Sequence, residues 1–376
     1  EITIMGTGFG DSPRVLLGEL ALDNVTLVSS TELKATVLWG LTPGIYDLTV
    51  VNADEVSDTL ESAITITDGF GEFITNGPYG GQAVQMALKP GNPTTVYGIM
   101  WGAGLFMSED GGDNWVKIHN HDWGVQLDFD ADDPNTIYFG SEKLYRSQDG
   151  GLSWINLTSS FDYHVFGCFL SYPAAHPTQG GTIYFGMGAC GDSSLNDGVG
   201  GVYYSENHGE DWNRFDYWES DGLDVGDFDI KSLAIHPDGS TIVAGTHNGK
   251  IIYSKNGGVN WDEVIVDPLE GIVTRIFINP HEELQLWAIT RGNIVGNFGS
   301  ARVYRSSDLI NWEEITGVEL VPSSGNQMAF TDDTIWLASN YLYRYTDGGD
   351  TWDKIDGVNG MPLAIAISPD NPQVIY

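Results

Sequence analysis

The sequence predicts an all-β protein in which a small antiparallel β-sandwich precedes a β-propeller. Three observations predict this fold class. Short apolar runs separated by Gly, Pro, Asp and Ser fill residues 1–68, which is the spacing of a sandwich of short strands. A motif of the form SEDGGDNW recurs along residues 69–376, at intervals of about 40 to 60 residues, the length of a four-stranded blade. The chain has 48 Gly and only 18% charged residues, which is typical of an ordered, turn-rich chain.

Residues 1–68 contain six segments with the pattern of short strands. In the first, ITIMGTGFG (2–10), apolar and polar residues alternate before a glycine turn. The succession of ITIMGTGFG, VLLGELA and LTPGIYDLTVVNADEVSD resembles the IPT/TIG family of immunoglobulin-like domains. The resemblance implies an Ig-like spacer, stacking unit or partner-binding sandwich without catalytic residues. The proline and paired glycines that usually open this family are absent, so we expect the natural polypeptide to begin earlier.

Six copies of the repeated motif mark residues 69–376. They are SEDGGDNW (108–115), SQDGGLSW (147–154), SENHGEDW (205–212), SKNGGVNW (254–261), SSDLINW (306–312) and YTDGGDTW (345–352). A β-type segment precedes each copy, and a short strand such as VKI follows each Trp. One such unit cannot cover both of its faces, so neighbouring units must pack against it. The repeat therefore predicts blades arranged around an axis.

Within each copy, the residue types predict a tight hairpin held by its own side chains. The hydroxyl at the first position and the carboxylate or amide at the third can bond backbone groups, and Gly tolerates the positive φ of the turn. The Trp can bury on the order of 200 Å² between blades. We therefore assign a structural role to Ser108, Asp110, Trp115, Ser147, Asp149, Trp154, Ser205, Asn207, Trp212, Ser254, Asn256, Trp261, Ser306, Asp308, Trp312, Asp347 and Trp352.

These copies resemble the Asp-box, or BNR, repeats of sialidases, xyloglucanases and sortilin-type propellers. Two copies depart from the pattern, because the fifth is shortened and lacks glycines and the sixth has Tyr345 at the hydroxyl position. We expect those two hairpins to be shaped differently.

The end of the chain predicts an incomplete blade. Residues 362–376 repeat the first two strands of a blade, as seen at 83–99. Propellers commonly close their ring with an N-terminal strand, and residues 71–81 are the candidate. That blade would still lack a strand, so we expect at least seven four-stranded blades and a chain cut at both ends.

The resemblance also indicates where a functional site would lie. The repeated hairpins join the third and fourth strands of a blade, and sialidases and xyloglucanases keep their active sites on the opposite face. Aromatic residues there suit stacking on sugar rings or anchoring a protein, although ordinary loop packing explains them equally well. Histidines on different blades are too dispersed to favour a transition metal. The ligand-binding candidates are Trp101, His119, His121, Trp123, His164, Tyr217, Trp218, His247 and Arg291.

Two acidic runs have the oxygen ligands that calcium prefers. DFDADD contains Asp128, Asp130, Asp132 and Asp133. Neither run has EF-hand spacing, so solvated acidic loops are the preferred alternative, and no cofactor other than calcium is expected. The better calcium candidates are Glu219, Asp221, Asp224, Asp227 and Asp229.

Charge excludes several partners. The 52 Asp and Glu against 16 Lys and Arg leave a formal net charge of −36, which repels nucleic acid and anionic membranes. No apolar run is long enough to span a membrane. The two cysteines, Cys168 and Cys190, could form a disulfide or remain buried thiols.

The residues argue against the activities of the related propellers. A sialidase needs an arginine trio, and its Arg-Ile-Pro element is missing here. Xyloglucanases carry a catalytic Asp where this chain has Met100 and Trp101, and the sequence does not single out the two carboxyl groups that glycoside hydrolysis requires. Photosystem-assembly propellers use a basic patch, which the net charge disfavours.

The sequence therefore favours a non-catalytic extracellular or cell-surface protein, acting as a scaffold, in adhesion or in recognition. Its expected partners are other protein subunits or surface glycans, and it could self-assemble into a cell-surface layer or filament. The alternative is a secreted glycoside hydrolase or glycan-binding protein that uses the face opposite the repeated hairpins.

Overall fold

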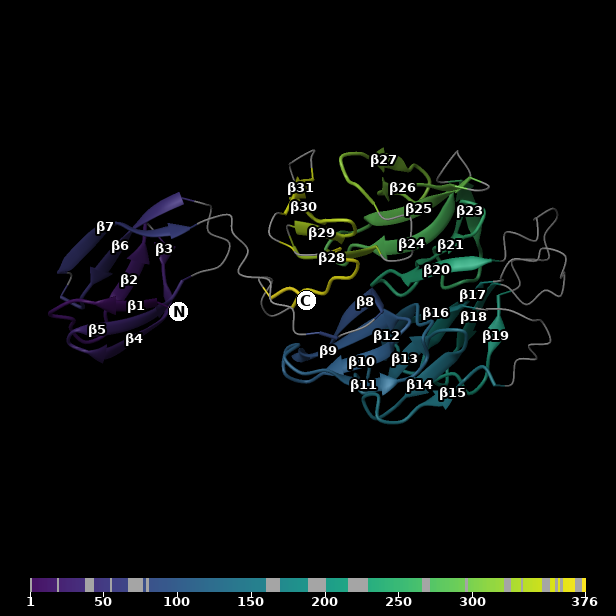
Figure 1. Cartoon of the computed structure of the whole chain (residues 1–376), viewed down its shortest axis with the longest axis horizontal. Helices are drawn as coiled ribbons and strands as arrows, with labels where there is room; N and C mark the ends of the chain where they lie inside the picture. Colours follow the sequence, from purple (N-terminus) through teal and green to yellow (C-terminus); the bar gives the residue numbers. More distant parts are fainter. Residues whose placement is uncertain are drawn as a thin grey trace. The chain divides into compact units, whose positions relative to one another are not determined.

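A computed structural model gives the fold of the chain (Figure 1). It describes residues 2–18, 20–37, 44–54, 56–66, 77–78, 81–159, 170–188, 201–215, 229–265, 271–294, 297–320, 326–332, 334–346, 352–355, 358, 361–368 and 374–376. All regular secondary structure in these ranges is β-strand. The chain forms two compact units, Glu1–Phe73 and Ile74–Tyr376.

The first unit consists of two antiparallel sheets. One has the order β1-β5-β4 and the other β3-β2-β6-β7. Alternating burial along β5 places Leu33 and Ala35 in a core with Val15 and Leu17, all at most 1% exposed. The strands are β1 (Ile2–Met5), β2 (Arg14–Leu17), β3 (Leu20–Ala21), β4 (Asp23–Ser29), β5 (Glu32–Thr36), β6 (Gly44–Val51) and β7 (Ser57–Ile66).

The described residues of the second unit form six four-stranded antiparallel sheets, each made of four strands consecutive in sequence. We call them blades 1 to 6. Blade 1 comprises β8 (Gln82–Lys89), β9 (Asn92–Trp101), β10 (Gly104–Ser108) and β11 (Val116–His119). Blade 2 comprises β12 (Gln126–Phe129), β13 (Ile137–Gly140), β14 (Leu144–Ser147) and β15 (Ile155–Asn156). Blade 3 comprises β16 (Leu170–Ala175), β17 (Ile183–Gly188), β18 (Gly201–Ser205) and β19 (Asn213–Arg214).

The remaining blades repeat this order. Blade 4 comprises β20 (Ile230–Ile235), β21 (Ile242–Thr246), β22 (Lys250–Ser254) and β23 (Asp262–Ile265). Blade 5 comprises β24 (Ile272–Ile278), β25 (Leu286–Ile294), β26 (Asn297–Ser306) and β27 (Glu313–Ile315). Blade 6 comprises β28 (Gln327–Phe330), β29 (Thr334–Ala338), β30 (Leu342–Thr346) and β31 (Asp353–Lys354). The first strand of each blade lies at the centre of the unit (Figure 1).

Apolar cores lie between neighbouring blades, as the repeat predicts. One cluster joins Trp287 and Ile289 of β25 to Leu337 of β29, all three fully buried. Because both faces of such a strand are covered, β13 reads as the continuous apolar run IYFG rather than as an alternating pattern. The prediction of a β-propeller is therefore confirmed.

Side chains of the innermost strands connect the blades around a central cavity of about 360 Å³. The amide of Gln85 on β8 bonds the backbone N–H and C=O of Leu127 on β12, at 2.6 and 3.1 Å. Gln327 on β28 bonds Met86 on β8 in the same way, both at 3.0 Å. Blade 6 is thereby linked to blade 1.

A short strand pair follows blade 6. Ile367 bridges Ile375, and Ala366 and Tyr376 exchange backbone hydrogen bonds of 2.9 and 2.8 Å. The Ile365 N–H donates to the same Gln327 oxygen that Met86 uses, which places this pair beside blades 6 and 1. A seventh full blade remains a prediction, since most of the candidate closing strand at 71–81 lies outside the described residues.

Candidate functional site

The repeated hairpins define one face of the propeller. In the first, the Ser108 hydroxyl donates to Asp110 at 2.8 Å and accepts the Gly112 N–H at 2.8 Å. Asp110 accepts the Asn114 N–H at 2.8 Å, and the Trp115 indole donates to the Gly112 carbonyl at 2.9 Å. The Ser and Asp or Asn bonds recur in the hairpins of blades 2, 3 and 4. These side chains hold the turns.

The fifth hairpin keeps the same bonds although it is one residue shorter. Leu309 replaces the second glycine and adopts a φ of 71°. Its N–H donates to Ser306 at 3.0 Å, and its carbonyl accepts the Trp312 indole at 3.1 Å. The Leu309 side chain is fully buried in the core between blades 4 and 5. The shortened hairpin thus keeps its hydrogen bonds, and the side chain that replaces the glycine is accommodated in the core.

In the sixth hairpin, Tyr345 takes the place of the first hydroxyl. It is 9% exposed and packs against Trp287 and Trp352, and its hydroxyl accepts a bond from Arg305 of blade 5 at 3.3 Å. Asp347 lies outside the described residues.

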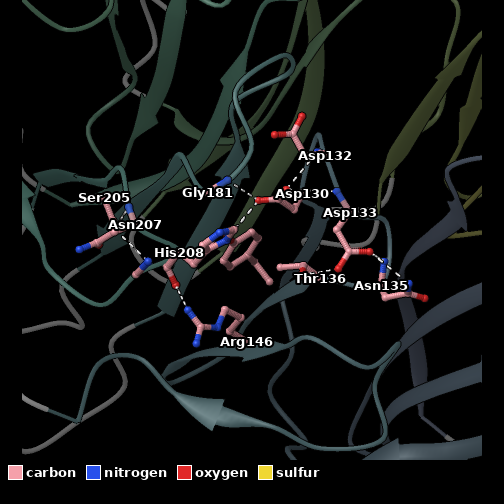
Figure 2. A network of polar contacts seen from close by, with 12 residues as sticks. Asp130, Asp132, Asp133, Asn135, Thr136, Arg146, Gly181, Ser205, Asn207 and His208 are labelled. Atoms are coloured by element: carbon pink, nitrogen blue, oxygen red, sulfur yellow. Dashed lines mark hydrogen bonds and ion pairs between the residues drawn. The ribbon is translucent and has the colours of Figure 1, made fainter.

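The DFDADD run supports turns and blade contacts (Figure 2). Asp130, 3% exposed, accepts the Gly181 N–H at 2.7 Å and the Tyr138 hydroxyl at 3.3 Å. Its carboxylate lies 3.6 Å from His208 in the third hairpin. Asp133 instead accepts bonds from residues 135 and 136 of its own turn. Within the described ranges, no three His, Cys, Asp or Glu side chains are arranged to hold a metal ion.

The face opposite the hairpins contains a pocket of about 190 Å³. It is built where second strands end and where first strands begin, and the antiparallel order of each blade brings these points to one end. Trp101 ends β9, and Trp123 lies between blades 1 and 2, with ring centroids 5.6 Å apart at 56°. The lining residues are Trp101, Trp123, Gly124, Val125, Tyr172, Lys231, His247, Ile272, Thr274, Arg275 and Arg291.

The pocket is rich in cationic and aromatic groups. Lys231 lies 2.8 Å from Asp229, which is also 3.5 Å from His247. Burial lowers the pKa of His247, although Asp229 opposes that shift. Burial raises the pKa of Tyr172 to about 12, so its hydroxyl stays protonated at neutral pH. The pocket is thus lined by hydrogen-bond donors.

Arg275 separates the pocket from the central cavity, since it lines both. It extends from β24 of blade 5 and donates to the Val125 carbonyl beside blade 2 at 3.4 Å. Gln126 similarly reaches the Leu233 carbonyl of blade 4 at 3.2 Å. The pocket therefore lies at one mouth of the channel.

The structure brings four of the nine predicted ligand-binding residues together, namely Trp101, Trp123, His247 and Arg291. It places His119 and His121 elsewhere, stacked 5.3 Å apart against Tyr145. Burial lowers the pKa of His119 to about 4, which fits a packing role. Outside the described residues lie His164, Tyr217, Trp218, Glu219, Asp221, Asp224, Asp227, Cys168 and Cys190.

Sequence reasoning missed Tyr172, Lys231 and Arg275, because it looked for ligands in loops and these residues lie within strands. One signal was available for Arg275. It is the one charged residue in the mostly apolar strand IVTRIFI, where a charge needs an explanation.

No protein-family model matches the sequence, and no curated protein resembles it significantly. Solved structures do resemble the fold. An ancestral GH74 enzyme matches 77% of this chain at 20% identity and a TM-score of 0.55, and the match spans only 40% of that enzyme. YCF48 bound to a D1 peptide matches 80% of this chain and 92% of its own, at 19% identity and a TM-score of 0.51. YCF48 from Cyanidioschyzon merolae matches 76% and 88%, at 17% identity and a TM-score of 0.51.

Proposed function

We propose that this chain is a non-catalytic recognition protein whose propeller binds a ligand in the pocket at the channel mouth. The observation that carries this proposal is the pairing of two indoles with several hydrogen-bond donors in one concave site. Aromatic walls with a few convergent polar groups are the usual composition of a small-ligand site. Trp123 is 50% exposed, so a ligand can reach it without rearrangement of the blades.

The lining argues for binding rather than turnover. Glycoside hydrolysis requires two carboxyl groups that flank the bond, and the described lining of the pocket contains none. The nearby Asp229 is paired with Lys231. The likeness to an ancestral GH74 enzyme supports the alternative of a secreted glycoside hydrolase, and the YCF48 complex with a peptide supports protein recognition on this fold.

The wider role follows from the chain's organisation. We propose that the hairpins are Asp-box repeats and that the first unit is an IPT/TIG domain which presents the propeller outside the cell. Adhesion, self-assembly into a surface layer and calcium binding by the 219–229 run are parts of the same proposal. Within the described residues, no helix has the length and apolarity needed to cross a membrane.

Binding to immobilised glycans and surface-protein fragments tests the proposal. Trp101→Ala and Trp123→Ala should each weaken binding by about 3- to 10-fold, because each removes an aromatic contact of about 0.5–1.5 kcal/mol. Leu152→Ala is the control, since Leu152 is 78% exposed in a hairpin of the opposite face. Binding that survives both tryptophan changes would contradict the proposed site. Release of a sugar product that stops in Asp229→Asn would instead favour the hydrolase.

A further inference from the structure

Arg275 is a buried cation in the lining of the pocket. It is 7% exposed, and the Val125 carbonyl at 3.4 Å accepts its hydrogen bond. Among the residues that the structure describes, Arg275 forms no ion pair. Burial lowers its pKa, and only Tyr172 acts in the opposite direction. Burying an arginine without a partner is costly, so a retained guanidinium here needs an anion from outside the chain or a structural purpose.

The neighbouring groups define what that anion would look like. Asp229 pairs with Lys231, and Arg275 adds to the pocket a positive charge beside Arg291, in a protein of net charge −36. The planar fork of arginine matches a carboxylate in a bidentate manner. A doubly charged phosphate would suffer more from the surrounding acidity. Tyr172, protonated at neutral pH, can add a further donor.

The remaining walls suit a ring. Trp101 and Trp123 present two tilted indole faces, and the volume of about 190 Å³ is below the roughly 300–1,000 Å³ typical of sites for larger ligands. One sugar ring fits that description better than an extended chain does. The apolar C–H face of such a ring can pack on an indole while its carboxylate points toward the channel axis.

We propose that this pocket binds a hexuronate, with its carboxylate on Arg275 and its ring against Trp101 and Trp123. This inference rests on the proposed function and names its ligand class. The specificity would come from Arg275, because a hydrogen bond to a charged group contributes about 1.5–3 kcal/mol. The indoles would supply affinity for the ring irrespective of its charge.

Calorimetric titration of the full chain with methyl glucuronide and methyl glucoside tests the inference. The two sugars differ only at C6, which is a carboxylate in the glucuronide and a hydroxymethyl group in the glucoside, and acetate serves as a carboxylate without a ring. We expect the glucuronide to bind at least about tenfold more tightly than the glucoside and acetate to bind more weakly than the glucuronide. Arg275→Met should abolish the preference, and Arg275→Lys should keep part of it.

A stability measurement separates binding from a structural role. If Arg275 serves the ligand, Arg275→Met should melt at or above the temperature of the unchanged protein, since an apolar side chain of similar volume replaces an unpaired charge. A lower melting temperature with an unchanged preference for glucuronide would overturn the inference in favour of a channel plug. If the Met variant does not fold, the ratio of the glucuronide and glucoside affinities is compared between the unchanged protein and Arg275→Lys. A smaller ratio in Arg275→Lys supports the inference, and an equal ratio overturns it.

The outcomes also distinguish this inference from the proposed function. Equal binding of glucuronide and glucoside, lost in Trp101→Ala, would overturn the hexuronate while leaving a recognition pocket. Binding of a protein fragment alone, with neither sugar bound, would overturn the hexuronate as well. If no tested ligand binds at this pocket, both the hexuronate inference and the proposed recognition function are overturned.

Discussion

The second glycine of the hairpins in blades 2, 3 and 4 is a residue on which blade packing depends. A Cβ at Gly151 would lie 2.6 Å from Ile118 of the preceding blade, and one at Gly209 would lie 2.6 Å from Leu157. Both glycines also have positive φ, at 101° and 84°. The glycine is therefore required by the neighbouring blade as well as by the turn.

Gly257 and Gly258 separate these two requirements. Both have positive φ, at 67° and 91°, but a Cβ at Gly257 meets no atom within 4 Å, whereas one at Gly258 overlaps the Phe215 ring. We expect Gly257→Ala to cost about 1 kcal/mol through backbone strain and Gly258→Ala to cost a further 1–3 kcal/mol through overpacking. Urea denaturation of the two variants measures the difference. Equal losses would contradict a packing role for the second glycine.

At the scale of elements, the innermost strands connect blades through polar side chains. Asp128 on β12 accepts the Ala175 N–H of β16 at 2.8 Å and the Phe129 N–H at 2.9 Å. Ser232 on β20 accepts the Ile276 N–H of β24 at 2.7 Å. Each bond satisfies a backbone group that faces the central cavity. Hydrogen bonds therefore connect the inner strands of blades 6, 1, 2 and 3, and those of blades 4 and 5, even though different blades share no sheet.

Asp128 makes these connections sensitive to pH. Asp128 is half-buried, and it lines the central cavity rather than the outer surface. Burial raises the pKa of its carboxyl group to about 6. A carboxyl whose pKa is raised on folding binds its proton more tightly in the folded state. Its stabilising contribution is complete below the ordinary pKa of 3.8 and is lost as pH rises through about 6.

Asp128→Asn should therefore gain stability relative to the unchanged protein as pH rises from about 5 to 7. The reason is that the amide never has to ionise inside the cavity. Melting temperatures recorded across this range measure the gain, and Asp122→Asn at an exposed position controls for the loss of one negative charge. A difference between Asp128→Asn and the unchanged protein that does not vary with pH would refute the assignment.

At the scale of the whole molecule, contacts distant in sequence bring the ends of the propeller together. Gln327 bonds Met86, 241 residues away, and the Tyr376 hydroxyl reaches the Pro93 carbonyl at 3.5 Å. Such closure contacts must form late, because their chain entropy is lost before the contacts are gained. We therefore expect the stability of the propeller to depend more strongly on these closure contacts than the stability of an open solenoid of the same blades would.

The net charge of −36 acts on this whole ring. Raising NaCl from about 10 mM to 150 mM shortens the Debye length from about 30 to 8 Å, so self-repulsion weakens and the melting temperature should rise. Tetramethylammonium chloride at the same ionic strength should act equally. A much larger rise with micromolar calcium would instead point to a specific site at the 219–229 run, and a fall in melting temperature with salt would contradict the argument.

Four of the eleven residues that line the candidate site were predicted from the sequence. Trp101 and Trp123 were found because the ends of second strands and the connections between blades lie on the face opposite the hairpins. Tyr172 and Arg275 were missed because a strand residue reaches this pocket only through the curvature of the ring. His119 ends β11, and its ring packs against Tyr145 and Trp154 instead of lining the pocket.

The sequence by itself determined the all-β class and the chemistry of the hairpins in blades 1 to 4, because these depend on contacts among residues close together in the chain, and its repeat indicated the propeller. Only the tertiary structure decided that Arg275 of blade 5 reaches Val125 beside blade 2, and that indoles and cations share one pocket. Those contacts cross the axis of the ring. Their residues are far apart in sequence, and no local pattern records which of them meet.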